Sequence, residues 1–243
     1  MSGHSKWNNI KRTKEKSDAQ RGKIFTKIGR EIAVVVKQGG SDPNVNPSLK
    51  NVIQKAKQNN MPNDSIERSI KKAAGELSGV NYEAMTYEGY GAGGSAVIVE
   101  CLTDNKNRTA GDVRHAFDKH GGSLGSTGCV SYLFKRRGLI VLEKTLDTDV
   151  DSVMLDCLDE GADDVVEQDD VLEVYTSPSN FNSVRDGLEQ KGYKFLSAEV
   201  TLLADNYIEL DESKLEQFQK MLDALNDSDD VQNVYHNVSN CEE

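Results

Sequence analysis

The chain has 243 residues, of which 37% are hydrophobic and 28% are charged. This composition is typical of a soluble globular protein with room for two or three small domains. No apolar run approaches the roughly 18 residues that a membrane-spanning helix needs. The longest apolar stretch near the N-terminus, residues 32–36, is too short for the core of a signal peptide. We therefore expect a cytoplasmic protein that has no membrane partner.

The net charge of −11 would argue against a nucleic-acid partner, but the charges are distributed unevenly. Residues 1–75 contain 16 Lys and Arg against 6 Asp and Glu, a local net charge of +10. The rest of the chain therefore has a net charge of −21. Parts of such opposite sign indicate one basic surface for a polyanion and one acidic body.

The cysteines are scattered and form no C-x-x-C pair. They are Cys101, Cys129, Cys157 and Cys241. This spacing suits neither a zinc site nor a disulfide framework, and it predicts free thiols in a reducing compartment. Cys101 and Cys129 stand in apolar, strand-like runs, so we expect both to be buried as small hydrophobic side chains.

A helix is predicted over residues 18–37, after a basic arm at residues 1–16. Its apolar residues follow 4-4-3 spacing and form one stripe, and Gly39-Gly40 ends it. At about 100° per residue, four cations lie together on the opposite side. They are Lys23, Lys27, Arg30 and Lys37.

Two further helices are predicted in this basic region. One begins at Asn46-Pro47, a polar N-cap followed by proline in the first helical position. The other begins at Asp64, where Glu67 would complete a capping box, and it ends near Gly75. Residues 1–76 are therefore expected to form a three-helix bundle with an N-terminal arm, followed by a linker at residues 76–83.

The pattern from residue 136 to residue 204 predicts a β-α-β-β-α-β order, which is that of a ferredoxin-like domain. Before it, strands at 95–103 and 130–134 flank a helix at 108–119, and this set lacks a second helix and strand. A helix at 212–225 and a strand at 230–236 would complete it. We therefore expect an α+β multidomain chain: the helical bundle, then two ferredoxin-like domains, one (136–204) inserted in the other (84–135 plus 205–243).

Motifs for catalysis or for a cofactor are lacking. Residues 89–94 match G-x-G-x-x-G, but a strand and not a helix is expected to follow, so we interpret them as a flexible loop and not as a dinucleotide site. Residues 147–151 resemble the start of a calcium loop, yet the sixth and twelfth positions are Ser152 and Leu158. The histidines form no metal-ligand cluster, and no nucleophile has an assigned base. We expect no enzyme, no metal and no cofactor.

The strongest positive signal is the basic N-terminal region, because Lys and Arg neutralise phosphates and release counterions. Seven cations fall within residues 6–23, together with Trp7, which could stack on a base. Arg108 and Arg114 suggest a second, weaker patch. The expected nucleic-acid-binding residues are Lys6, Trp7, Lys11, Arg12, Lys14, Lys16, Arg21, Lys23, Lys27, Arg30, Arg108 and Arg114.

An acidic run follows residue 155, and it has two interpretations. The simpler one is a solvated face, and the sharper one is a docking surface for a basic protein partner. Its members are Asp156, Asp159, Glu160, Asp163 and Asp164.

Several stretches closely resemble one known family. They include Gly3-His4-Ser5-Lys6-Trp7, residues 21–27, Asn60-Met61-Pro62, residues 87–91 and residues 99–105. The chain is similar to the YebC/PmpR family of probable transcriptional regulators, which includes mitochondrial translational activators of cytochrome c oxidase. It departs at Ala92, where proline is expected, and at Ser48, where a basic residue is expected.

The resemblance implies a helical bundle with two ferredoxin-like domains, and a nucleic-acid-binding regulator of gene expression. A DNA-binding transcriptional regulator is the first hypothesis. The second is a translational activator on the ribosome that binds rRNA or tRNA and eases the synthesis of difficult nascent chains. The third is an adaptor whose acidic domains dock proteins, and an enzyme comes last. The preference for DNA or RNA, the targets and the oligomeric state stay open at this point.

Overall fold

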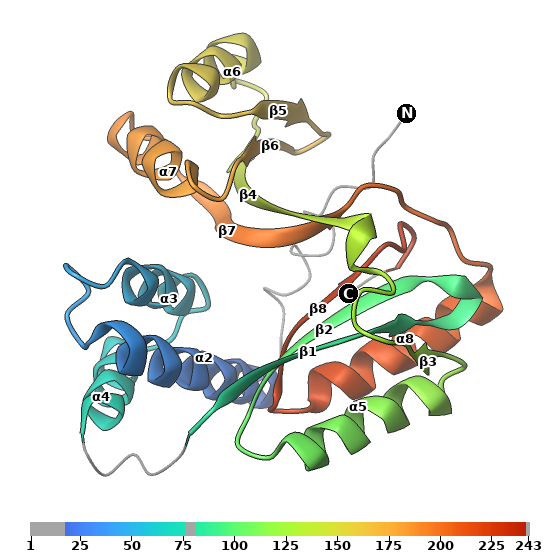
Figure 1. Cartoon of the computed structure of the whole chain (residues 1–243). Coiled ribbons are helices and arrows are strands. Elements are labelled where there is room, and N and C mark those ends of the chain that lie inside the picture. The colour runs from blue at the N-terminus through green and yellow to red at the C-terminus, as the bar shows by residue number, and fades with distance from the viewer. Residues whose placement is uncertain (1–17, 76–80, 242–243) are drawn as a thin grey trace. The chain divides into compact units, whose positions relative to one another are not determined.

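The computed structural model describes residues 18–75 and 81–241, with the side chains of residues 18–20 left aside. The chain divides into two compact units (Figure 1). Among the described residues, one unit consists of residues 133–205, and the other contains the segments before and after it. Within residues 18–75 and 81–241, no helix is long and apolar enough to cross a membrane.

The predicted three-helix bundle is present. Its helices are α2 (Asp18–Gly39), α3 (Pro47–Gln58) and α4 (Asn63–Ala74). Of the expected apolar stripe of α2, Ile28 and Ile32 are buried, whereas Ile24 and Val35 are only partly buried. The neighbouring Val36 is buried as well, and Leu49 of α3 and Ile66 of α4 pack in the same core. Burial of these side chains provides the main stabilisation of so small a unit.

The start of α3 is confirmed, and the start of α4 differs from the prediction. The Asn46 side chain accepts a hydrogen bond from the backbone N–H of Leu49, as an N-cap should. Helix α4 instead follows Pro62, and none of the described side chains caps it. The capping box of Asp64 and Glu67 is therefore wrong, because the helix begins before Asp64 and places this residue inside its first turn.

The first sheet has the strand order β3-β1-β2-β8, and every neighbouring pair is antiparallel. Its strands are β1 (Glu83–Tyr90), β2 (Ala96–Thr103), β3 (Ser123–Leu124) and β8 (Val231–His236). Helices α5 (Lys106–Lys119) and α8 (Glu212–Asp227) cover one face (Figure 1), where Val97, Val99, Phe117 and Phe218 form the centre of the core. The C-terminal helix and strand thus return to this sheet, as the sequence predicted.

Two features of this part of the fold differ from the prediction, and so does the start of the strand that follows it. Strand β1 was not expected, and it pairs with β2 along its whole length. Residues 131–133 form a 3-10 turn and not a strand. In the second sheet, the long strand β4 (Phe134–Glu143) begins before the expected domain boundary at residue 136 and contains the basic triplet at residues 135–137.

The second sheet has the order β5-β6-β4-β7 and the connectivity β4-α6-β5-β6-α7-β7, which is the ferredoxin-like arrangement. The other members are β5 (Asp164–Glu167), β6 (Val171–Thr176), β7 (Phe195–Ala204), α6 (Val150–Asp159) and α7 (Phe181–Gln190). Val153 and Cys157 of α6 and Leu188 of α7 pack on Ile140 and Leu172 of the sheet. The order of these elements matches the expectation, although β4 begins at Phe134, before the expected start of the domain at residue 136.

The glycine-rich segment at residues 89–94 is a connection between strands. A 3-10 turn over Ala92–Gly94 leads into β2, so no helix N-terminus follows that could receive a phosphate. Gly89 is required by close packing, since a Cβ there would lie 2.5 Å from the Ser123 carbonyl oxygen.

The four cysteines are free thiols. Cys101 is buried in β2 as expected, and burial raises the pKa of its thiol to about 12. Cys129 differs from the expectation, because it lies in a turn and is only half-buried.

A substitution at Asn46 tests how the bundle is held together. Besides capping α3, its amide donates hydrogen bonds to the carbonyl oxygens of Val35 (2.9 Å) and Gly40 (2.8 Å). We expect Asn46→Ala to lower the free energy of unfolding by about 2 kcal/mol, since a cap and two buried hydrogen bonds are lost. The control Ser48→Ala, at an exposed position two residues away, should change it by less than about 0.5 kcal/mol. Urea denaturation of both variants measures the difference, and equal midpoints would contradict this role of Asn46.

Candidate nucleic-acid interface

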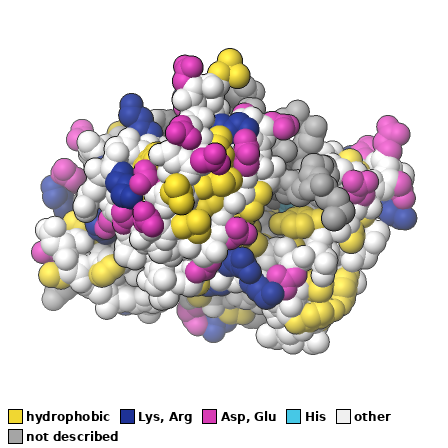
Figure 2. All heavy atoms as spheres, turned by 90° about the horizontal axis from the view of Figure 1, so that it is seen from above, with side chains coloured by type: hydrophobic (Ala, Val, Ile, Leu, Met, Phe, Trp, Pro, Cys, Tyr) yellow, Lys and Arg dark blue, Asp and Glu magenta, His cyan; other side chains and the backbone are white. Residues whose placement is uncertain are grey.

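Charged side chains of both signs lie on the surface of the protein. On the face drawn in Figure 2, acidic side chains lie on several sides of a central group of hydrophobic ones. Six of the predicted nucleic-acid-binding residues fall in the arm, outside the described residues. They are Lys6, Trp7, Lys11, Arg12, Lys14 and Lys16.

The cationic face of α2 lies against the turn between α8 and β8. Lys23 forms an ion pair with Asp227, and the Lys27 ammonium donates a hydrogen bond to the Asn226 carbonyl oxygen at 3.0 Å. Near the end of the helix, Lys37 donates a hydrogen bond to the Asn81 side chain. The face that the sequence assigned to phosphates is thus used, at least in part, to attach the bundle to the first α+β sheet.

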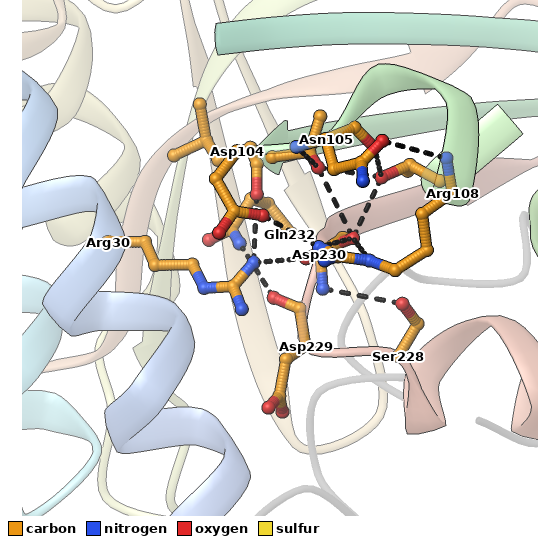
Figure 3. A network of polar contacts seen from close by, with 11 residues as sticks. Arg30, Asp104, Asn105, Arg108, Ser228, Asp229, Asp230 and Gln232 are labelled. Carbon is orange, nitrogen blue, oxygen red and sulfur yellow. Dashed lines mark hydrogen bonds and ion pairs between the residues drawn. The ribbon is translucent and has the colours of Figure 1, made fainter. Parts of the chain in front are cut away.

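Asp230 is the centre of this attachment (Figure 3). Its carboxylate is only 5% exposed and forms ion pairs with Arg30 of α2 and with Arg108 of α5, the latter at 2.7 Å. The Thr109 hydroxyl also donates a hydrogen bond to it at 2.7 Å. Three elements that are distant in the sequence therefore meet at one carboxylate.

Arg30 is the most constrained of the predicted cations. Its guanidinium also donates a hydrogen bond to the Leu102 carbonyl oxygen at 3.0 Å and lies 5.3 Å from the centre of the Tyr82 ring. Its side chain is 15% exposed. A phosphate could reach it only by displacing Asp230, so the role of Arg30 in this structure is to fix the position of α2.

The electrostatics of the cluster favour the fully charged state. Burial alone would raise the pKa of the Asp230 carboxyl, but hydrogen bonds from the two guanidiniums and from Thr109 hold it at about 2. Hydrogen bonds to Asp230 and Asp104 raise the pKa of Arg108 in turn. The cluster therefore stays ionised throughout the physiological pH range.

The second predicted patch is only partly available. Arg108 pairs with Asp104 at 2.8 Å as well as with Asp230, although its side chain is 47% exposed. Arg114 is exposed on α5, and Arg21 is exposed near the start of α2.

Cations on the outer faces of α3 and α4 were not selected from the sequence. Lys57, Arg68 and Lys72 are all exposed there. Lys55, by contrast, forms an ion pair with Glu31 at 2.6 Å and is directed into the bundle. The helical period could have identified Arg68 and Lys72, because they lie opposite the apolar stripe of α4, whereas Lys57 lies beside that of α3.

A cavity of about 740 Å³ opens between α2, α4 and the segment leading into β1. Phe25, Ala33 and Val34 form an apolar wall, and Lys37 and Lys72 stand at its polar side. Among the residues that the structure describes, no group of His, Cys, Asp and Glu is arranged to hold a metal ion. The cavity thus combines an apolar wall with two lysine side chains.

Comparisons with known proteins account for nearly the whole chain. Residues 5–76 match the family model described as the TACO1/YebC protein N-terminal domain. Residues 82–238 match the model of the TACO1/YebC second and third domain.

Full-length relatives and a solved structure agree with this match. A probable transcriptional regulatory protein of Hathewaya histolytica is 60% identical over 98% of this chain and 97% of its own length. One from Acetivibrio thermocellus is 58% identical over 98% of each chain. The crystal structure of a conserved hypothetical protein, Aq1575 from Aquifex aeolicus, superposes with a TM-score of 0.81 at 44% identity, covering 92% of both chains.

Acid denaturation tests the role of Asp230. Its folded pKa is lower than that of an unfolded Asp, so its stabilising effect is complete above about pH 4 and is lost as the pH falls through about 2. We expect Asp230→Asn to lower the free energy of unfolding at pH 7 by about 3 kcal/mol, because two partly buried guanidiniums lose their counter-charge. The variant should also lack most of the decline that the parent protein shows between about pH 4 and pH 2.

The matched control is Asp229→Asn, at the exposed neighbouring position. It should change the free energy of unfolding by less than about 0.5 kcal/mol. Urea denaturation at several pH values in the acid range measures the free energy of unfolding of both variants. Equal losses for the two substitutions would show that Asp230 has no special role.

Proposed function

Since the chain belongs to the TACO1/YebC family, we propose that it is a cytoplasmic, non-enzymatic regulator of transcription that binds DNA through its N-terminal domain. Its relatives are named as probable transcriptional regulatory proteins, which supports the first part of this proposal. The contact with nucleic acid is inferred from the charges of the chain.

The observation that carries the proposal is the separation of charge. The first 75 residues have a net charge of +10 and the rest of the chain has one of −21. A polyanion is attracted by the first part and repelled by the second, so only one part of the molecule can approach a phosphate backbone closely.

We propose a binding surface that combines the basic arm with the exposed cations of the bundle. The arm supplies Lys6, Lys11, Arg12, Lys14 and Lys16, with Trp7 available to stack on a base. The outer faces of α3 and α4 add Lys57, Arg68 and Lys72, and Arg21 adds an exposed cation near the start of α2. Lys23 and Lys27 are left out because they contact Asp227 and Asn226. Arg30 is left out because of its contact with Asp230, and Arg114 is at most an outlying contact.

This surface suits contacts with the backbone more than recognition of bases. Bidentate recognition of adenine needs Asn or Gln on a face that enters the major groove. The cationic face of α2 carries only Lys and Arg and is engaged with the α8–β8 turn. Phosphate contacts position a protein and carry little sequence information. We therefore propose modest sequence discrimination by this chain alone.

The dependence of affinity on salt tests the surface. If about six phosphates are neutralised, log affinity should fall against log salt with a slope of roughly −5. Lys57→Glu, Arg68→Glu and Lys72→Glu together should flatten that slope by about 2 to 3 units, and so should reversal of Lys11, Arg12, Lys14 and Lys16. Fluorescence anisotropy with a labelled DNA duplex gives these slopes.

The matched control reverses three exposed cations outside the bundle, Lys194, Lys214 and Lys220. It alters the net charge as much as the Lys57, Arg68 and Lys72 variant does, but it should leave the slope within about 1 unit of the parent value. If all three multiple variants flatten the slope alike, binding depends on net charge and not on this surface.

A competition titration tests the choice of DNA. A labelled promoter fragment bound to the protein is challenged with random duplex and with purified ribosomes at one salt concentration. We expect random duplex to compete at an excess well below the roughly 10³-fold typical of specific regulators, and ribosomes to compete no better per phosphate. Much stronger competition by ribosomes would replace the transcriptional proposal with a role in translation.

A further inference from the structure

The exposed face of helix α6 has an unusual composition. Leu155 and Leu158, one helical turn apart, are 63% and 50% exposed, whereas Val153 and Cys157 on the other face are buried in the core. Leu146, in the loop that leads into α6, is also fully exposed. Single exposed leucines are common, but a pair on one helix face forms an apolar strip in contact with water.

Carboxylates stand at both ends of this leucine pair. Asp151 lies one turn before Leu155 and Asp159 one turn after it, and both are exposed. Within the described ranges, 18–75 and 81–241, neither of these two aspartates forms an ion pair. The acidic character extends well beyond the helix, because residues 145–184 contain twelve Asp and Glu and not one Lys or Arg.

The C-terminal end of α6 indicates that a ligand on this face would carry positive charge. The last turn of a helix carries partial negative charge and is normally stabilised by Lys or Arg. Here the last turn contains Asp156 and Asp159 and no basic residue. Lys191 compensates Asp156 at 2.7 Å and reaches Glu160 at 3.3 Å. The carboxylate of Asp159 lies at the negative end of the helix dipole, which is unfavourable. Among the described side chains, no cation pairs with it.

We propose that this face of α6 is a docking surface for a cationic protein segment that carries apolar side chains at helical spacing. The apolar side chains would cover Leu155 and Leu158, and Lys or Arg beside them would neutralise Asp151 and Asp159. A nucleic acid is excluded as the occupant by the same carboxylates. The proposal is independent of the DNA-binding surface, which lies on other residues.

The test uses the full-length protein and a defined probe. The probe is a fluorescent synthetic peptide of Lys and Leu whose leucines fall on one helix face, compared with a peptide of the same composition in scrambled order. We expect the amphipathic peptide to bind at least about tenfold more tightly than the scrambled one. Leu155→Ser with Leu158→Ser, and separately Asp151→Lys with Asp159→Lys, should each weaken its binding by at least about tenfold.

Two matched controls address general stickiness. Asp112→Lys with Asp118→Lys makes the same charge change on the exposed side of α5, and Val45→Ser removes an exposed apolar side chain from the bundle. Both should leave peptide affinity within about twofold of the parent value. DNA affinity should be unchanged in the leucine variant, which separates this surface from the DNA-binding one.

Three results would overturn the proposal. The first is equal binding of the amphipathic and scrambled peptides. The second is equal weakening by the α5 and α6 charge reversals. The third is a concentration-dependent dimer, measured by sedimentation, that dissociates in the leucine variant, because the occupant would then be a second copy of the chain.

Discussion

The position of the basic bundle depends on one buried carboxylate. Asp230 receives guanidinium groups from α2 and α5 and a hydroxyl from Thr109, so the bundle, the first sheet and the α8–β8 turn are joined at one point. A buried charge of this kind costs desolvation free energy, and only its full set of partners offsets that cost. Because Arg30, Arg108 and Asp230 are far apart in the sequence, their contact can form only after distant parts of the chain have folded together. The contact thereby also directs cations of α2 toward the α8–β8 turn.

The helices and the inserted domain could be predicted from the sequence because their signals are local. Periodicity, the Asn46 cap and the turn residues each act over a few positions, and the ferredoxin-like order of residues 134–204 followed from them. Strand β1 was missed because only two of its apolar side chains, Met85 and Tyr87, pack against the core, a pattern too short to distinguish from a loop. Its pairing with β2 stabilises it instead. The backbone of β4 continues through three cations, since ladder hydrogen bonds to β7 do not depend on side-chain type.

The candidate interface was harder to predict for a related reason. The helical period correctly placed Lys23, Lys27 and Arg30 on one face of α2, but it could not reveal that the α8–β8 turn, about two hundred residues later, provides their partners. A charged face that looks solvated in the sequence can be an internal contact. The exposed cations Lys57, Arg68 and Lys72 carry the same local signal and differ only in lacking such a turn opposite them among the described residues.

The basic and the acidic parts of the chain are suited to different ligands, a polyanion and a cationic protein segment. At physiological ionic strength exposed charges act over about 8 Å, so each surface is governed by its own neighbourhood and not by the net charge of −11. A chain whose cations contact phosphates mainly as point charges gains affinity but little sequence discrimination. Selectivity must then come from a second contact, and linking two modest contacts multiplies their effects. The acidic, leucine-bearing face of α6 is suited to that contact because it repels the nucleic acid and attracts a cationic protein beside it. Selection of a target by such a regulator would thus depend on two ligands bound at once.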